Sequence, residues 1–288
     1  MMNPIKFFKY HGLGNDYIVL NPEDLNTTLA PEQITRICHR NFGIGSDGIL
    51  LGPLADKDHG TDFALKIYNT DGSEAEKSGN GLRIFSRYLW DKGLVDSKPF
   101  TIHTLGGIVT SQILNGGKEI SVGMGHVSFQ SKDVPVVGPN REVIDENIVI
   151  DGVSYTYCAA TIGNPHCVIV KDEISKEEAC KYGPNIEIDS LFPNRTNVQF
   201  MRILDRNNIQ IEIWERGVGY TLASGSSASA SAAVAFKLGH IDSHVTVHMP
   251  GGNMEIEIAE DFSIQMTGAV TRVCEGLIDP EIFDIERA

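Results

Sequence analysis

Alternating apolar and polar residues predict strands along much of the chain, and two longer stretches have helical periodicity. Residues 209–214, 244–249 and 253–259 alternate and are predicted to be strands. Helices are predicted over about 82–92 and 226–238, because each stretch is followed by a glycine, which commonly ends a helix. The second helix consists almost entirely of Ala, Ser and Val, so we expect it to be buried against neighbouring backbone. These patterns predict a mixed α/β (α+β) protein.

A weak internal repeat links one predicted strand, turn and helix to another. The segment from Lys66 aligns without gaps with the segment from Glu212 at an offset of 146 residues. The aligned pairs are Ile67 with Ile213, Tyr68 with Trp214, Asn69 with Glu215, and Ser78-Gly79 with Ser224-Gly225. Each copy is predicted to be a strand, a polar turn, and a small-residue loop that opens a helix.

A second pair of similar segments supports a duplication of the whole unit. Residues 11–20 resemble residues 161–170, since a Gly-Asn pair precedes an apolar run in both, with Asn15 and Asn164 offset by 149. Two pairs in the same order indicate two halves of one ancestral unit. We therefore predict two pseudo-symmetric domains, residues 1–130 and 131–275. The segment 276–288 is expected to pack back on the first half.

Length and composition narrow the class of protein. The 288 residues suit two domains, and no apolar run approaches the roughly 20 residues of a membrane span. The N-terminal segment does not resemble a signal peptide, so a cytoplasmic location is expected. Five scattered cysteines argue against a disulfide framework and a structural zinc site. The net charge of −14, without a Lys/Arg cluster, argues against nucleic-acid and membrane partners. A homodimer is the predicted assembly.

The two small-residue loops, 78–81 and 224–227, are the leading candidates for a binding site. Each stands at a predicted helix N-terminus, where free backbone N–H groups and a partial positive charge favour an anion. The alternative is that Ser78 and Ser224 are plain N-caps and the glycines are turn residues. Their matching positions in two halves favour a shared site, in which the two serines face each other across one cleft.

Other polar residues near these loops are weaker candidates. Glu215 and Arg216 follow a strand-like run and could hold an ammonium and a carboxylate, although such pairs usually lie on the surface. His166 could orient a catalytic group or act as a base, although a lone histidine is more often structural. Asparagines in turn-like contexts usually make local backbone bonds. The asparagines concerned are Asn15, Asn69, Asn164 and Asn197.

Three histidines have a spacing that suggests metal binding on a helix. His240, His244 and His248 would line one face of a helix, but residues 244–249 alternate and are predicted to form a strand. We therefore predict no metal site.

Six motifs, in order along nearly the whole chain, resemble the diaminopimelate epimerase family. They are HGLGNDY from His11, NFGIGSDGIL from Asn41, NTDGSEAEKSGNGLR from Asn69, TIGNPH from Thr161, RTNVQF from Arg195 and WERGVGYTLASGS from Trp214. The resemblance implies that each domain is a curved mixed sheet around a central helix. It also implies inversion of an amino-acid α-carbon without pyridoxal phosphate or another cofactor. In the family one cysteine removes the α-proton and a second delivers a proton to the opposite face. Diaminopimelate, a lysine and peptidoglycan precursor, is the leading substrate.

Carried over by motif, the resemblance assigns roles to individual positions. Ser78 and Ser224 stand at the acid/base positions, and His166 and Glu215 match residues associated with catalysis. The positions that match substrate contacts and backbone donors are Asn15, Gly48, Asn69, Gly79, Asn80, Asn164, Asn197, Glu215, Arg216, Gly225 and Ser226.

The chain departs from the family at three positions. Serine replaces both catalytic cysteines, and Gly48 stands where some members have a substrate-contacting Gln. A serine hydroxyl is far less acidic than a thiol and needs an adjacent base. Three explanations remain open: an engineered double Cys→Ser variant, a relative that inverts another amino acid with a different acid/base pair, or a non-catalytic binding paralogue.

Overall fold

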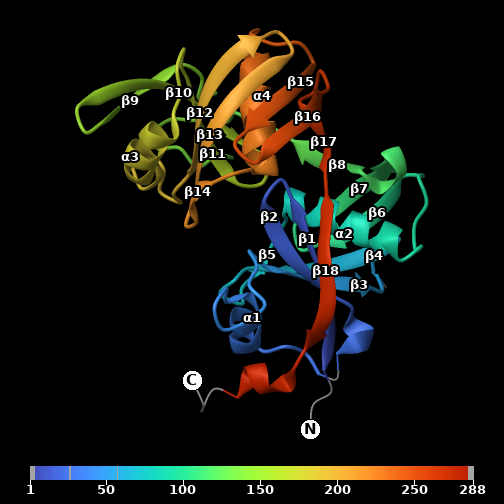
Figure 1. The fold of residues 1–288 in the computed structure, drawn as a ribbon. Helices are drawn as coiled ribbons and strands as arrows, with labels where there is room; N and C mark the ends of the chain where they lie inside the picture. The colour runs from blue at the N-terminus through green and yellow to red at the C-terminus, as the bar shows by residue number, and fades with distance from the viewer. Residues whose placement is uncertain (1–3, 26, 57, 285–288) are drawn as a thin grey trace. The chain divides into compact units, whose positions relative to one another are not determined.

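The chain divides into two compact units. The computed structural model describes residues 4–25, 27–56 and 58–284 (Figure 1). The first unit comprises the described residues up to Val122 together with those from Gly268 onward, and the second unit runs from Gly123 to Thr267. Among the described residues, no helix is both long and apolar enough to span a bilayer.

The first unit is a mixed sheet with one long buried helix and one short helix. Its strands are β1 (Ile5–Gly12), β2 (Asn15–Leu20), β3 (Ile49–Leu54), β4 (Phe63–Tyr68), β5 (Glu74–Ala75), β6 (Phe100–Thr104), β7 (Gly107–Leu114), β8 (Glu119–His126, whose last residues belong to the second unit) and β18 (Thr271–Ile278). Helix α1 (Pro31–Cys38) follows β2, and helix α2 (Gly79–Asp91) follows β5. Three short 3-10 turns, Pro22–Asp24, Asn115–Gly117 and Pro280–Phe283, complete it.

The second unit repeats this order of elements. Its strands are β9 (Glu146–Ile150), β10 (Val153–Thr161), β11 (Pro165–Val170), β12 (Asn197–Asp205), β13 (Asn208–Glu215), β14 (Gly219–Thr221), β15 (His244–Met249), β16 (Gly252–Ile258) and β17 (Ser263–Ala269). Helix α3 (Lys176–Glu187) follows β11, and helix α4 (Gly225–Lys237) follows β14.

The pairing of strands is the same in both units, which confirms the predicted duplication at the level of topology. The parallel pairs β2–β3 and β4–β6 correspond to β11–β12 and β13–β15. The antiparallel pairs β1–β2, β3–β4, β4–β5 and β6–β7 correspond to β10–β11, β12–β13, β13–β14 and β15–β16. The fold is therefore a mixed α+β fold built twice.

The end of the chain completes the sheet of the first unit. Strand β18 pairs antiparallel with β1, as β9 pairs with β10, and its register runs from Ile278 opposite Ile5 to Thr271 opposite His11. The chain rejoins the first unit at Gly268, and the second unit begins at Gly123. The predicted limits were 131–275 for the second domain and 276–288 for the returning segment, so both limits lie earlier in the structure. The sequence did not show this because β18 pairs through its backbone, which leaves no signal in the side-chain pattern.

The two long helices occupy the predicted places but begin earlier. Helix α2 begins at Gly79 and α4 at Gly225, because Ser78 and Ser224 cap them. Most residues of α4 are buried, as its small side chains predict. The hydroxyl of Ser229 donates to the Gly225 carbonyl at 2.8 Å, so a buried serine is satisfied within the helix itself.

Candidate active site

Ser78 and Ser224 have the same backbone conformation and the same capping role. Their φ and ψ angles are −139° and 116° for Ser78, and −143° and 124° for Ser224. Ser78 Oγ accepts a hydrogen bond from Gly81 N at 3.0 Å, and Ser224 Oγ accepts one from Ser227 N at 3.4 Å. Each serine is thus an N-cap, which was the alternative interpretation of these loops. Capping uses a lone pair of the oxygen and leaves the hydroxyl proton available.

A tyrosine lies next to the first of these serines. The Tyr17 hydroxyl is 3.2 Å from Ser78 Oγ, and Tyr17 is buried in β2. Ser78 is partly exposed, whereas Ser224 is buried. The first cap therefore combines access to solvent with a phenol at hydrogen-bond distance.

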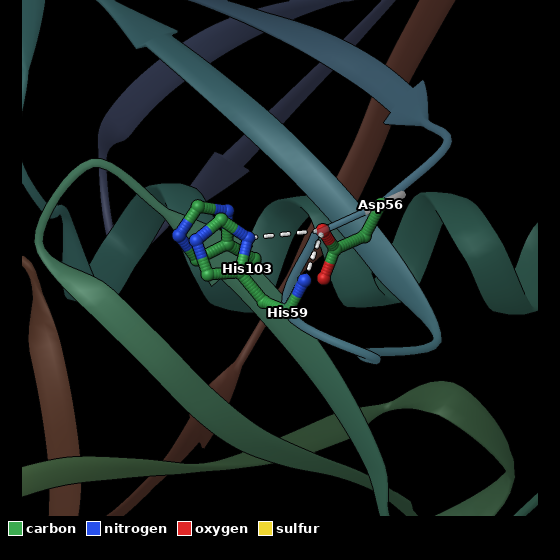
Figure 2. A group of neighbouring side chains, drawn as sticks. All are labelled: Asp56, His59 and His103. Carbon is green, nitrogen blue, oxygen red and sulfur yellow. Dashed lines mark hydrogen bonds and ion pairs between the residues drawn. The ribbon is translucent and has the colours of Figure 1, made fainter.

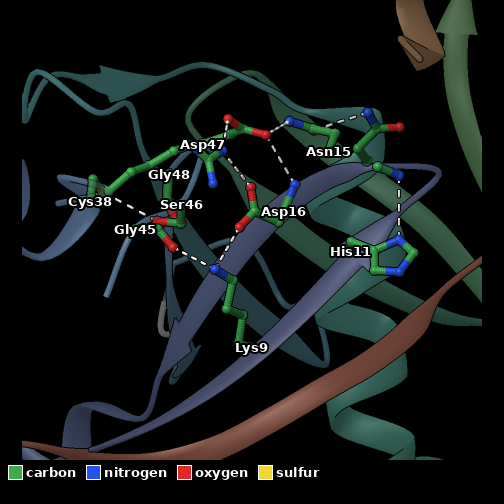
Figure 3. Close-up of polar contacts among 12 residues, drawn as sticks. Lys9, His11, Asn15, Asp16, Cys38, Gly45, Ser46, Asp47 and Gly48 are labelled. Atoms are coloured by element: carbon green, nitrogen blue, oxygen red, sulfur yellow. Dashed lines mark hydrogen bonds and ion pairs between the residues drawn. The ribbon is translucent and has the colours of Figure 1, made fainter. Parts of the chain in front are cut away.

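A chain of hydrogen bonds fixes the amide of Asn15 in the first unit. Arg83 Nη2 donates to Asn80 Oδ1 at 2.8 Å, and Asn80 Nδ2 donates to Asn15 Oδ1 at 2.9 Å. Asn15 Nδ2 in turn donates to Asp47 Oδ2 at 2.8 Å (Figure 3). The chain runs from a buried guanidinium to a carboxylate, so its charges define the orientation of both amides.

Three charged side chains hold the anionic end of this chain in place. Arg40 Nη2 lies 2.8 Å from Asp16 Oδ1 and 2.7 Å from Asp47 Oδ1. Lys9 Nζ lies 2.8 Å from Asp16 Oδ2, and Figure 3 shows Asp16 between Lys9 and the Asp47 loop. Burial raises the pKa of the Asp16 carboxyl, but hydrogen bonds from Arg40 and Lys9 outweigh it and the pKa is lowered.

A second polar chain connects His166 to Ser224. His166 Nε2 lies 3.0 Å from Asn164 Oδ1, and Asn164 Nδ2 donates to Ser226 Oγ at 3.3 Å. Ser226 Oγ lies 3.4 Å from Ser224 Oγ. His166 is fully buried, and this desolvation lowers its pKa to about 3. A neutral, weakly basic imidazole is suited to orienting Asn164 and poorly suited to taking a proton.

Hydrogen bonds hold the loop that follows β13, which begins at Arg216. Asn197 Oδ1 accepts from Arg216 N at 3.0 Å, and Arg216 Nη1 donates to Asn194 O at 3.0 Å. Thr221 Oγ1 donates to Glu215 Oε2 at 3.0 Å. The structure therefore brings Asn197, Glu215 and Arg216 together at the end of β13.

A buried carboxylate that the sequence pattern did not single out supports the same loop. Glu187 ends α3 and accepts from Trp214 Nε1 and from Gly217 N, each at 2.7 Å. Arg195 forms an ion pair with it. Nothing in the sequence distinguishes this glutamate from the exposed acidic residues around it.

Two residues of the first unit that were predicted to contact substrate, Asn69 and Gly48, have local structural roles. Asn69 is exposed, and its Nδ2 donates to Ser73 Oγ at 3.0 Å, so it closes a local turn. At Gly48, a Cβ atom would lie 2.5 Å from Tyr68 O and 2.7 Å from the Tyr17 ring. A side chain cannot fit there, so any substrate contact by Gly48 is limited to backbone.

Strand register makes Tyr17 the internal counterpart of His166. Ile18 pairs with Ile49 in the first unit, as Cys167 pairs with Val198 in the second. The preceding residues are therefore equivalent: Tyr17 with His166, and Gly48 with Asn197. The sequence analysis did not single out Tyr17, although the 149-residue offset of the repeat pairs it with His166.

One cluster in the first unit has metal-ligating residue types. Donor atoms of Asp56, His59 and His103 lie within 4.8 Å of one another (Figure 2). The two imidazole rings are stacked, with centroids 3.7 Å apart and an interplanar angle of 20°. Lone pairs of parallel rings do not converge on one ion, and Asp56 already accepts bonds from the backbone of His59 and Thr61. The geometry therefore favours a loop cap.

The three histidines weighed as metal ligands lie elsewhere. His244 and His248 belong to β15, which confirms the predicted strand, and His240 precedes it. His248 contacts Asn208 Oδ1 at 2.8 Å, and His244 lies 3.3 Å from Glu255.

Known proteins resemble this chain along nearly its whole length. The diaminopimelate epimerase family model matches residues 7–130 and 158–273. Diaminopimelate epimerase 2 of Nostoc sp. (strain PCC 7120 / SAG 25.82 / UTEX 2576) is 64% identical over 282 residues, which cover 98% of each chain. The diaminopimelate epimerase of Caldanaerobacter subterraneus subsp. tengcongensis is 40% identical, covering 96% of this chain and 100% of that protein. A solved probable proline racemase from Agrobacterium radiobacter K84 shares the fold, with a TM-score of 0.70 at 15% identity over 98% of this chain and 94% of that one. The family model and the two relatives match nearly the whole chain, and the fold is duplicated with a serine-capped helix N-terminus in each unit. The chain therefore belongs to the diaminopimelate epimerase family.

Proposed function

We propose that this protein is a cofactor-independent amino-acid epimerase whose substrate is diaminopimelate, interconverting the LL and meso forms. The observation that carries the proposal is the pair of equivalent helix N-termini capped by Ser78 and Ser224. The names of the two relatives, at 64% and 40% identity, support the choice of substrate.

The proposed chemistry is proton transfer at the α-carbon. The free N–H groups of the first turns of α2 and α4 stabilise the α-carboxylate as negative charge develops on it. One serine, as its alkoxide, removes the α-proton and becomes the hydroxyl, while the hydroxyl of the other serine delivers its proton to the opposite face, so the reaction requires Ser78 and Ser224 at the same carbon. Arg216 and Glu215 are proposed to bind a carboxylate and an ammonium group, with Asn15, Asn164 and Asn197 as polar contacts.

Serine makes this chemistry slower than cysteine would. A thiol ionises near pH 8.5, far below an aliphatic hydroxyl. The bond from Gly81 N–H to Ser78 Oγ at 3.0 Å stabilises negative charge on that oxygen, and the longer bond of 3.4 Å at Ser224 does so less.

The test is incubation with LL-diaminopimelate in deuterated water. Formation of the meso isomer with α-deuterium supports the proposal, and it should increase when cysteine replaces serine at both positions. If the Ser78→Cys/Ser224→Cys double variant is also silent, diaminopimelate is not the substrate.

The serines also support a second candidate, a non-catalytic binder of amino acids. Calorimetry with LL-diaminopimelate then gives micromolar binding without exchange or inversion, whereas an epimerase exchanges the α-proton. A racemase of another amino acid on the same fold is detected by chiral product analysis across amino acids.

We further propose that the protein acts in the cytoplasm in the lysine and peptidoglycan precursor pathway, and that it is a homodimer. Sedimentation equilibrium tests the dimer: a monomer mass at micromolar concentration contradicts it.

A further inference from the structure

Tyr17 makes a contact that the proposed function does not use. Its hydroxyl lies 3.2 Å from Ser78 Oγ, a normal distance for a hydrogen bond between hydroxyls. The residue is 8% exposed and lies on β2, the strand that also carries Asn15. Ser78 thus has a titratable group directly beside the oxygen that is proposed to move a proton.

The surroundings of Tyr17 are built to place its ring there. A Cβ at position 48 would lie 2.7 Å from Cε1 and 3.1 Å from Cδ1 of Tyr17. Any residue larger than glycine at position 48 would therefore push the ring. The Tyr17 hydroxyl therefore reaches Ser78 only because position 48 has no side chain.

In the second unit, the residue equivalent to Tyr17 is also connected to the capping serine, here Ser224. His166, the counterpart of Tyr17, reaches Ser224 through Asn164 and Ser226. An amide does not readily pass a proton along, and this imidazole is a weak base because burial lowers its pKa to about 3. Among the described residues, Tyr17 thus contacts its capping serine directly, whereas His166 reaches Ser224 through Asn164 and Ser226.

We propose that Tyr17 is the acid/base partner of Ser78, exchanging protons with the substrate through the serine hydroxyl. This inference rests on the proposed epimerase function. Tyr17 is a positioning residue, because it acts through Ser78 and not on the substrate itself.

The proton transfers at Ser78 balance both when it removes and when it delivers a proton. When Ser78 removes the α-proton, the Cα–H bond breaks as a new Ser78 O–H bond forms, and the original serine proton moves to the Tyr17 phenolate. When Ser78 delivers a proton, its O–H bond breaks as Cα–H forms, and Tyr17 returns a proton to the serine and becomes the phenolate. Model phenols ionise near pH 10, well below aliphatic hydroxyls, so the phenol makes the serine a workable base and acid.

The experiment compares Tyr17→Phe with wild type, using both LL- and meso-diaminopimelate in deuterated water. Exchange of the α-proton is followed by NMR, and kcat and KM are measured from pH 6 to pH 10. Tyr17→Phe keeps the ring over Gly48 and removes only the hydroxyl. We expect kcat for the step through Ser78 to fall by about 100-fold or more, with little change in KM. We also expect an alkaline ionisation in the pH–rate profile of wild type that the variant lacks.

Two further variants separate chemistry from packing. Tyr10 lies on the neighbouring strand β1, and its buried hydroxyl donates to Asp91 Oδ2 of α2 at 3.0 Å. Tyr10→Phe removes this hydroxyl and should leave the profile unchanged. In a Ser78→Cys background the thiol ionises by itself, so adding Tyr17→Phe should cost less than about threefold.

Each outcome decides the inference. Equal losses in the serine and cysteine backgrounds, or an unchanged pH–rate profile, would show that Tyr17 only supports packing. If wild type shows no exchange while the Ser78→Cys/Ser224→Cys variant epimerises, the choice of substrate stands, but this chain binds it without turnover and the role of Tyr17 is refuted. If that cysteine variant is silent too, the proposed function itself fails.

Discussion

The buried imidazole of His166 gives a quantitative prediction for how stability changes with pH. Its pKa falls from an ordinary value of 6.5 to about 3 in the folded chain, because burial removes it from water. Between these values the unfolded chain carries one more proton than the folded chain. The contribution of His166 to stability is thus complete above pH 6.5 and is lost as the pH falls toward 3. The slope is about 1.4 kcal/mol per pH unit, or roughly 3 kcal/mol between pH 6 and pH 4.

His166→Gln removes this proton difference while keeping an amide N–H that can donate to Asn164. The free energy of unfolding is measured by urea denaturation at several values between pH 4 and pH 7. We expect the variant to be less stable at pH 7 but to lose less stability on acidification than wild type does. His240→Gln, at an exposed histidine, is the matched control. Parallel curves for wild type and His166→Gln would refute the buried neutral imidazole.

Other predictions concern the charged groups that hold the site loops. Glu187→Gln replaces a buried acceptor of two N–H groups by an amide, so we expect the free energy of unfolding in urea to fall by about 2–3 kcal/mol and KM to rise. The control variant, Glu142→Gln, lies at a partly exposed ion pair and should lower that free energy by less than about 1 kcal/mol. An unchanged midpoint for Glu187→Gln would contradict this. Burial raises the pKa of Asp16, but Arg40 and Lys9 lower it overall, so its stabilisation is present above about pH 4 and is lost below it. Asp16→Asn should therefore flatten the acid limb of the stability curve, and an acid limb as steep as that of wild type would exclude this ion-pair network as its source.

The sequence by itself determined the repeated units and the two loops. The apolar and polar pattern along residues 209–214 and 244–249 predicted strands that the structure contains, because alternation directly reflects the two faces of a sheet. The small residues of α4 also predicted its burial, because side-chain size sets how closely neighbouring elements can approach. The Ser78 and Ser224 loops were identified because helix N-termini have local sequence signals.

Only the tertiary structure decided which residues act together around those loops. Contacts between residues far apart in sequence, such as Tyr17 with Ser78 or Glu187 with Gly217, have no local pattern. The sequence analysis expected only residues 276–288 to return to the first unit. The sequence does not show that the return includes all of β18, because the bonds of β18 to β1 come from the backbone, which is the same in every residue. Side-chain pattern thus defines the elements and their exposed or buried faces, while long-range packing defines the partners of each site residue.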